Sequence, residues 1–137
     1  MVMVSRVRQR LRSGLAGESG SASVELVVVV PLVLLMLLAI VQFALWSHAT
    51  HVAQAAASYG LAATRVDGGS PAAGRVATYT ILAQLGDGPL RHATVSVDRG
   101  AAQARVRVSG TVVPVIPFLT LPVHGEAVGP VEQVAAP

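Results

Sequence analysis

The sequence predicts a membrane-anchored α+β protein with one long N-terminal transmembrane helix, a second short helix and a small antiparallel sheet of two to three strands. An uncharged apolar run covers residues 26–46, and an alanine-rich stretch follows it without a break. Beyond residue 90 the apolar residues change from helical spacing to alternation. The predicted organisation is a basic leader at residues 1–20, a long helix at 21–65 and a small extracytoplasmic α+β region at 66–137.

The uncharged run at residues 26–46 predicts the transmembrane segment. Gln42 is its only strongly polar residue. At about 1.5 Å per residue, about 20 helical residues cross the ~30 Å hydrocarbon core of a bilayer. Lipid offers the backbone no hydrogen-bonding partners, so this run must be helical although its valines favour strands. Trp46 ends the run and is placed to anchor the helix at the membrane surface.

The positive charge of the chain is concentrated ahead of this run. Four of the ten arginines lie in the leader, and the chain after it carries six arginines and six acidic residues. A basic flank stays on the cytoplasmic side, so we expect a cytoplasmic N-terminus and an extracytoplasmic C-terminal region. Because the region after the leader is formally neutral, the isoelectric point near 10.6 does not indicate nucleic-acid binding. The leader arginines are Arg6, Arg8, Arg10 and Arg12.

The junction between leader and apolar run contains Gly20, followed five residues later by Glu25. This spacing, at the start of a membrane helix after a short basic leader, resembles the processing site of type IV prepilins. The resemblance implies that a prepilin peptidase cuts after Gly20, so that Ser21 becomes the first residue and Glu25 the fifth. An acid that opens an apolar helix is costly and usually functional. The alternative is that Glu25 lies among lipid headgroups, where the helix dipole favours an anion.

Residues 21–43 more specifically resemble the N-terminal signature of TadE-like proteins. The positions that match the signature are Glu25, Pro31, Leu32, Ile40, Val41 and Phe43. Three positions depart from it: Leu26 replaces the usual aromatic residue, Ala39 replaces a glycine and Gln42 replaces a second acid. TadE-like proteins are minor pilin-like components of the bacterial tight-adherence (Flp) pilus assembly system, and a prepilin peptidase processes them.

The resemblance implies a pilin-like (pseudopilin) single-pass membrane subunit that takes part in pilus assembly. Its implied partners are the lipid bilayer, a prepilin peptidase and other pilin-like or pilus assembly subunits. The first alternative is an uncleaved single-pass anchor with a small extracytoplasmic domain that binds a partner. The second is a secreted domain released by signal peptidase at the Ala-Gln-Ala sequence of residues 53–55.

Pro31 lies six residues after Glu25, inside the predicted span. Proline removes one helical hydrogen bond and clashes with the preceding turn, so we expect a kink in the first third of the span. The alternative is a proline without structural consequence, since membrane helices tolerate this residue.

The long helix should continue to Arg65, because alanine is the best helix former and Asp67 is followed by two glycines that terminate helices. Small residues form a stripe along this part of the helix, at Ala49, Ala53, Ala56, Ala57 and Ala63. Small faces allow close approach of another element. This element is either a helix of a neighbouring subunit or the sheet of the same chain. We expect the lower, N-terminal half of the long helix to face outward and its upper, C-terminal half to contact the sheet.

A second helix should begin at Ser70 and Pro71, which are typical of the N-cap and first helical position. The predicted apolar face consists of Val76, Tyr79, Leu82, Ala83 and Leu85. The glycine- and proline-containing turn at residues 86–89 should end this helix.

Two alternating segments, residues 93–98 and 105–109, predict an antiparallel hairpin. Its buried side chains should be Val95, Val97, Val106 and Val108, with Arg105 and Arg107 facing water. Residues 123–128 are a candidate third strand, and residues 129–137 should fray. Three prolines predict an extended loop before that strand. Its Phe118 and Leu119 are either buried under the sheet, which we favour, or form an apolar patch for a partner.

The sequence contains no recognisable catalytic or ligand-binding constellation. There is no cysteine, no nucleophile–base pair and no phosphate-binding glycine loop. His48 and His51 share a helix face but lack a third ligand, so they do not predict a metal site. We therefore expect no enzymatic activity, no cofactor and no small-molecule substrate.

Overall fold

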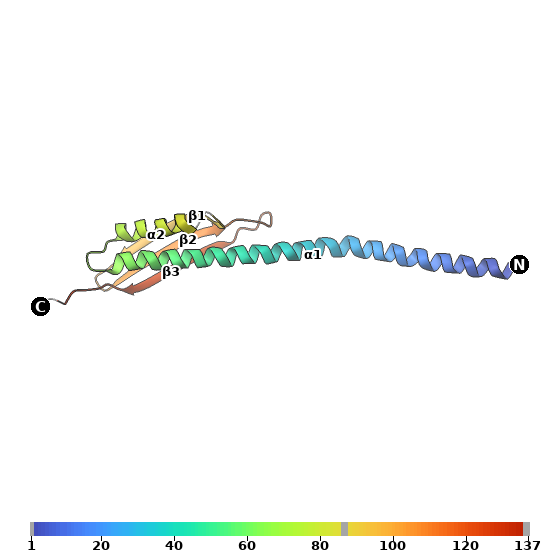
Figure 1. Ribbon diagram of the computed structural model, residues 1–137, viewed down its shortest axis with the longest axis horizontal. Coiled ribbons are helices and arrows are strands. Elements are labelled where there is room, and N and C mark those ends of the chain that lie inside the picture. Colours follow the sequence, from blue (N-terminus) through green and yellow to red (C-terminus); the bar gives the residue numbers. More distant parts are fainter. Residues whose placement is uncertain (1, 86–87, 136–137) are drawn as a thin grey trace. The chain divides into compact units, whose positions relative to one another are not determined.

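The computed structural model describes residues 2–85 and 88–135, with side chains from residue 20 onward. Its elements, in chain order, are α1 (Val2–Arg65), α2 (Pro71–Leu85), β1 (Leu90–Arg99), β2 (Gln103–Val112) and β3 (Pro122–Pro130) (Figure 1). The predicted α+β fold is confirmed. The chain divides into two units, Met1–Ala39 and Ile40–Pro137, which are described separately.

The first unit is the N-terminal part of α1. The helix already begins at Val2, so the basic leader is helical as well, although its arginine side chains lie outside the described part. Every described side chain of this unit is exposed, and none of the most apolar window of the helix is buried. Apolar side chains exposed around a whole helix are expected for a lipid-embedded segment and not for a helix in the core of a soluble protein. Length and composition thus suit this helix for crossing a membrane.

The second unit is a three-stranded antiparallel sheet in the order β1-β2-β3, with the C-terminal part of α1 and α2 on one face (Figure 1). In the predicted hairpin, Val97 pairs with Val106 and Val95 with Val108. Val97, Val106 and Val108 are buried as predicted, whereas Val95 is half-buried. The predicted third strand is confirmed as β3, which pairs with β2 along its whole length.

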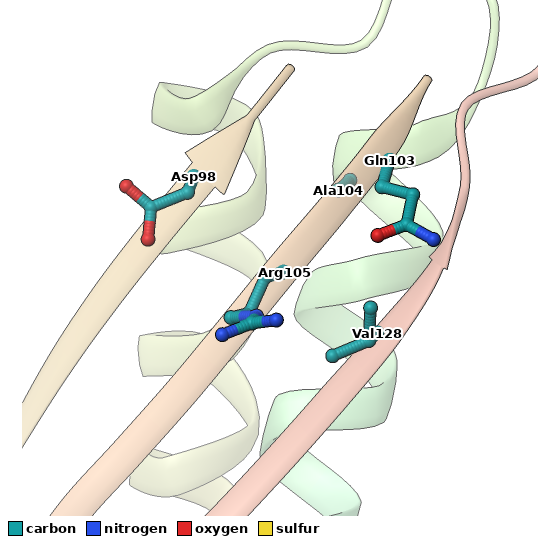
Figure 2. A pocket seen from close by; sticks show the side chains of 5 residues that line it. All are labelled: Asp98, Gln103, Ala104, Arg105 and Val128. Atoms are coloured by element: carbon teal, nitrogen blue, oxygen red, sulfur yellow. The ribbon is translucent and has the colours of Figure 1, made fainter. Parts of the chain in front are cut away.

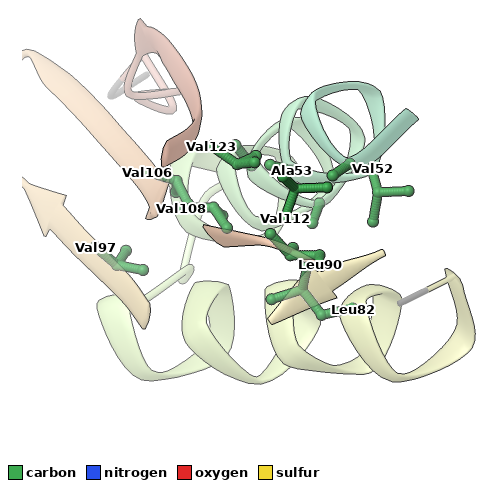
Figure 3. Packing of buried hydrophobic residues seen from close by; sticks show 12 residues of the cluster. Val52, Ala53, Leu82, Leu90, Val97, Val106, Val108, Val112 and Val123 are labelled. Atoms are coloured by element: carbon green, nitrogen blue, oxygen red, sulfur yellow. The ribbon is translucent and has the colours of Figure 1, made fainter. Parts of the chain in front are cut away.

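The core lies between the two helices and the sheet, and Figure 3 shows side chains from both helices and all three strands meeting there. Four alanines of α1 are completely buried in it: Ala49, Ala53, Ala56 and Ala57. Their partner is therefore the sheet of the same chain, while Ala63 is half-buried. The approach is so close that a methyl group on Gly125 of β3 would collide with the backbone of Ala53 and Gln54.

The two helices contact each other through glycine and threonine. A methyl group on Gly60 of α1 would collide with the Thr78 hydroxyl, and one on Gly74 of α2 with the Thr64 hydroxyl. Both hydroxyls are buried and each donates to a carbonyl of its own helix, Thr64 to Gly60 at 2.7 Å and Thr78 to Gly74 at 2.8 Å. Each hydroxyl thus has its hydrogen-bonding partner within its own helix and needs none in the other helix. The contact between the two helices is therefore made by small residues.

This contact corrects the predicted buried face of α2. The buried residues are Gly74, Thr78 and Leu82, and of the predicted apolar face only Leu82 is among them. Val76 is 67% exposed, and Tyr79, Ala83 and Leu85 are also exposed. The prediction failed because hydrophobic spacing favours large apolar residues, whereas a helix contact this close admits only small ones.

The predicted end of the long helix and the predicted start of the second helix agree with the structure, whereas α1 begins at Val2 and not at residue 21. Helix α1 ends at Arg65, and Gly68 adopts a left-handed φ of 71° beyond it. The guanidinium of Arg99 in β1 donates to the carbonyls of Thr64 and Val66, which caps the C-terminal end of α1. At the start of α2, the Ser70 hydroxyl accepts the N–H of residue 73 at 3.1 Å. The turn predicted to end α2 includes residues 86–87, which lie outside the described residues.

Two further predictions are wrong. Phe118 is fully exposed, with a relative accessibility of 103%, and Leu119 is exposed as well, so neither is buried under the sheet. The prediction that the chain frays from residue 129 is wrong for residues 129–132, because Gly129 and Pro130 belong to β3, and Val131 and Glu132 donate backbone N–H groups to the carbonyls of Ala102 and Arg65. These bonds hold the segment against the β1–β2 turn and the end of α1.

Candidate functional site

The three predicted processing residues, Gly20, Ser21 and Glu25, lie on α1 and are all exposed. A side chain at Gly20 would meet no other atom within 4 Å. Ser21 and Glu25 are four residues apart in the helix, a spacing that places them on the same face. The bond after Gly20 lies within this helix, and among the described residues the Gly20 position makes no packing contact beyond its own helical turn.

Pro31 is helical and exposed, six residues beyond Glu25. The helix continues through it, so its predicted kink stays a prediction.

In the second unit, Gln42 has a role that the sequence did not reveal. Its side chain is only 2% exposed, and its amide binds the backbone of the loop between β2 and β3. Gln42 Oε1 accepts the N–H groups of Val115 at 2.6 Å and Ile116 at 3.2 Å, and Nε2 donates to the Val113 carbonyl at 3.2 Å. A carboxylate could accept the first two bonds but could not donate the third. An amide therefore suits this position, where the TadE-like signature has an acid.

Two more side chains of α1 bind the backbone that leads into and along β3. Trp46 Nε1 donates to the Pro122 carbonyl at 2.9 Å. The Gln54 amide binds both backbone groups of Glu126, donating to its carbonyl at 2.8 Å and accepting its N–H at 3.2 Å. Strand β3 is at the edge of the sheet, and Gln54 occupies hydrogen-bonding groups that an additional strand would need. Helix α1 thus fastens both the loop and the edge strand.

The outer face of the sheet, opposite the helices, is polar. Glu126 lies between Arg105 at 3.3 Å and Arg107 at 3.1 Å. Figure 2 shows a shallow depression next to these residues, with Asp98, Arg105 and Val128 on three adjacent strands. Exposed ion pairs of this kind contribute little stability, and the lining contains no nucleophile–base pair. We assign no chemistry to this depression.

His48 and His51 are exposed and border a shallow groove on the outer side of α1 with Ile40 and Phe43. Within residues 2–85 and 88–135, no group of three His, Cys, Asp or Glu side chains is arranged to hold a metal ion.

Fold and site together define a class: a single-pass membrane protein whose anchoring helix continues into the core of a small α+β domain. Residues 20–61 match the model of the family described as TadE-like protein, in agreement with the resemblance of the N-terminal signature. The matched segment begins at Gly20, includes Glu25 and Pro31, and extends into the part of α1 that packs on the sheet. The match associates the chain with Tad pilus assembly. No curated protein and no solved structure matched the chain.

Proposed function

We propose that this protein is a pilin-like minor subunit in the assembly of a tight-adherence pilus or a related secretion system, with a structural and not an enzymatic role. The observation that carries the proposal is the TadE-like match, which starts at Gly20 within α1, directly ahead of its exposed apolar segment. Helix α1 anchors the subunit in the membrane, and its C-terminal part supports a small domain that contacts other assembly subunits. The arginine-rich leader keeps the N-terminus in the cytoplasm.

The proposed maturation step is cleavage after Gly20 by a prepilin peptidase. The exposure of Gly20 and Ser21 supports it, since a protease needs an accessible bond. Cleavage creates an amine on Ser21, one helical turn from Glu25. The carboxylate of Glu25 then pairs with this amine, either within the chain or in a neighbouring subunit. Pairing offsets part of the cost of placing an acid at the start of a membrane helix.

The test is the N-terminal sequence and mass of the protein expressed with and without a prepilin peptidase. With the peptidase the chain should begin at Ser21, and the Gly20→Ala variant should keep residues 1–20. Because a methyl group at position 20 meets no atom within 4 Å, a change in processing would not come from misfolding. Gly88→Ala is the matched control, because its methyl group also meets nothing, and it should be processed normally. If Gly20→Ala changes neither size nor export, the proposal is wrong.

The alternative is an uncleaved single-pass anchor with a small partner-binding domain. The observation that favours it is the continuity of α1, which runs through the leader from Val2 without interruption. An N-terminus at Met1 in cells that contain the peptidase would support this alternative. Release by signal peptidase at residues 53–55 has less support, because Ala53 is completely buried in the core and cleavage there would remove part of that core.

A further inference from the structure

We infer that the loop at residues 113–121, between β2 and β3, is a second membrane contact of this protein and inserts into the lipid headgroup region beside the anchoring helix. This inference depends on the membrane anchor but not on processing or pilus assembly. The loop is attached to α1 within the second unit by the bonds from Gln42 and by Trp46, which binds Pro122 at the end of the loop.

The attachment places the loop beside the last residues of the uncharged run, residues 40–46, which belong to the second unit. Gln42 lies within residues 26–46 and precedes Trp46, the predicted interface anchor, by four residues. Four residues correspond to about 6 Å along a helix, so the loop binds α1 about one turn closer to the hydrocarbon than Trp46 does. The neighbouring surface of α1 is apolar and exposed at Ile40, Val41 and Phe43. The loop therefore extends a surface that already faces lipid.

The composition of the loop fits this location. No Asp, Glu, Lys or Arg occurs between Arg107 and Glu126. Phe118 is fully exposed and holds a left-handed φ of 66°, which bulky residues rarely adopt. Within the described chain, Phe118 thus exposes its ring to solvent while its backbone is strained. An aromatic ring at a membrane interface gains contacts that water does not offer.

Several backbone N–H groups of the loop are absent or already bound, which reduces the cost of a poorly hydrated environment. Unsatisfied N–H and C=O groups prevent most loops from entering a membrane. Here Pro114 and Pro117 have no N–H, and the N–H groups of Val115 and Ile116 are bound by Gln42. The N–H of Val113 is bound by Pro89 at 2.8 Å, and that of Leu119 by Ile116 at 3.2 Å. Gln42 therefore lowers the desolvation cost of the loop.

The absence of cysteine allows a direct test with single labels in the full chain. Leu119→Cys carries an environment-sensitive fluorophore next to an intact Phe118, in nanodiscs that hold one copy each. Phe43→Cys, on the exposed apolar side of α1, is the lipid-facing control, and Ser96→Cys, on the outer face of the sheet, is the water-facing control. The probes are lipids that carry a spin-label quencher and iodide in the buffer.

We expect the label at position 119 to resemble that at position 43, with a blue-shifted emission, strong quenching by the spin-labelled lipid and little quenching by iodide. Adding Phe118→Asp should reduce the lipid quenching at 119 and leave that at 43 unchanged. Because Phe118 makes no buried contact, this variant should keep its circular dichroism spectrum. Iodide quenching at 119 equal to that at 96 would refute the inference. Protection from both quenchers would also refute it, since it would mean that protein covers the loop.

Discussion

Replacing Gln42 with leucine should free the loop at residues 113–121 from α1. The substitution introduces an apolar side chain of similar size and removes three hydrogen bonds, to Val113, Val115 and Ile116. Each such bond contributes about 1 kcal/mol net, and a buried group left without a partner costs about 1–3 kcal/mol. The bonded groups are half-buried, so water compensates part of the loss, and we expect the free energy of loop opening to fall by about 3 kcal/mol.

The assay is amide hydrogen exchange of the full chain in nanodiscs. A loss of about 3 kcal/mol corresponds to about a hundredfold faster exchange at Val115 and Ile116, because each 1.4 kcal/mol is a factor of ten. Exchange at Val106, in the centre of the sheet, should change much less. Gln84→Leu is the matched control, since Gln84 is exposed on α2 and should leave loop exchange unaltered. Unchanged protection of Val115 and Ile116 in Gln42→Leu would refute the assignment of Gln42 as the attachment of the loop.

Three further substitutions test other contacts by the free energy of unfolding of the second unit. Gly74→Ala should destabilise the second unit by about 1–2 kcal/mol. Overpacking against Thr64 costs about 1–3 kcal/mol, and the higher helix propensity of alanine offsets up to about 1 kcal/mol of this cost. The control Gly88→Ala should have no effect, and a Gly74→Ala variant that is more stable than the wild type would contradict the close helix contact. In detergent solution, Phe118→Gly should stabilise the second unit by about 1 kcal/mol, because glycine adopts the left-handed backbone without strain; destabilisation would show that the ring makes a contact worth more than this strain. Glu126→Ala should cost less than about 1 kcal/mol, because its ion pairs are exposed, and a larger loss would indicate a buried role.

The candidate processing site depends on the sequence motif and stays a prediction. Gly20, Ser21 and Glu25 form a local motif whose meaning depends on spacing and on the apolar run that follows, both of which are visible in the sequence. The structure adds that these residues are exposed and that a methyl group at Gly20 has space, so a processing defect of Gly20→Ala would not result from misfolding. The structure adds nothing about the chemistry of cleavage, which is inferred from the motif.

The sequence by itself determined the features that arise from neighbouring residues. Length and the absence of charge define the anchoring helix, alternation defines β1 and β2, and Ser70 and Gly68 mark helix boundaries. In each case the physical cause lies within a few residues, such as the helical repeat, the pleat of a strand or a side-chain cap.

Only the tertiary structure decided which surfaces meet. The buried face of α2 depends on Gly60 and Thr64 of another helix, and no apolar spacing in α2 encodes it. Gln42 binds groups more than 70 positions away in the chain, so its amide appeared in the sequence only as a departure from a signature. Phe118 was expected in the core because it is large and apolar, yet its ring is fully exposed on a loop whose backbone is bound by Gln42 of α1. Packing and long-range hydrogen bonds join segments that are distant in the sequence, and a local sequence pattern does not indicate which distant segment will be the partner.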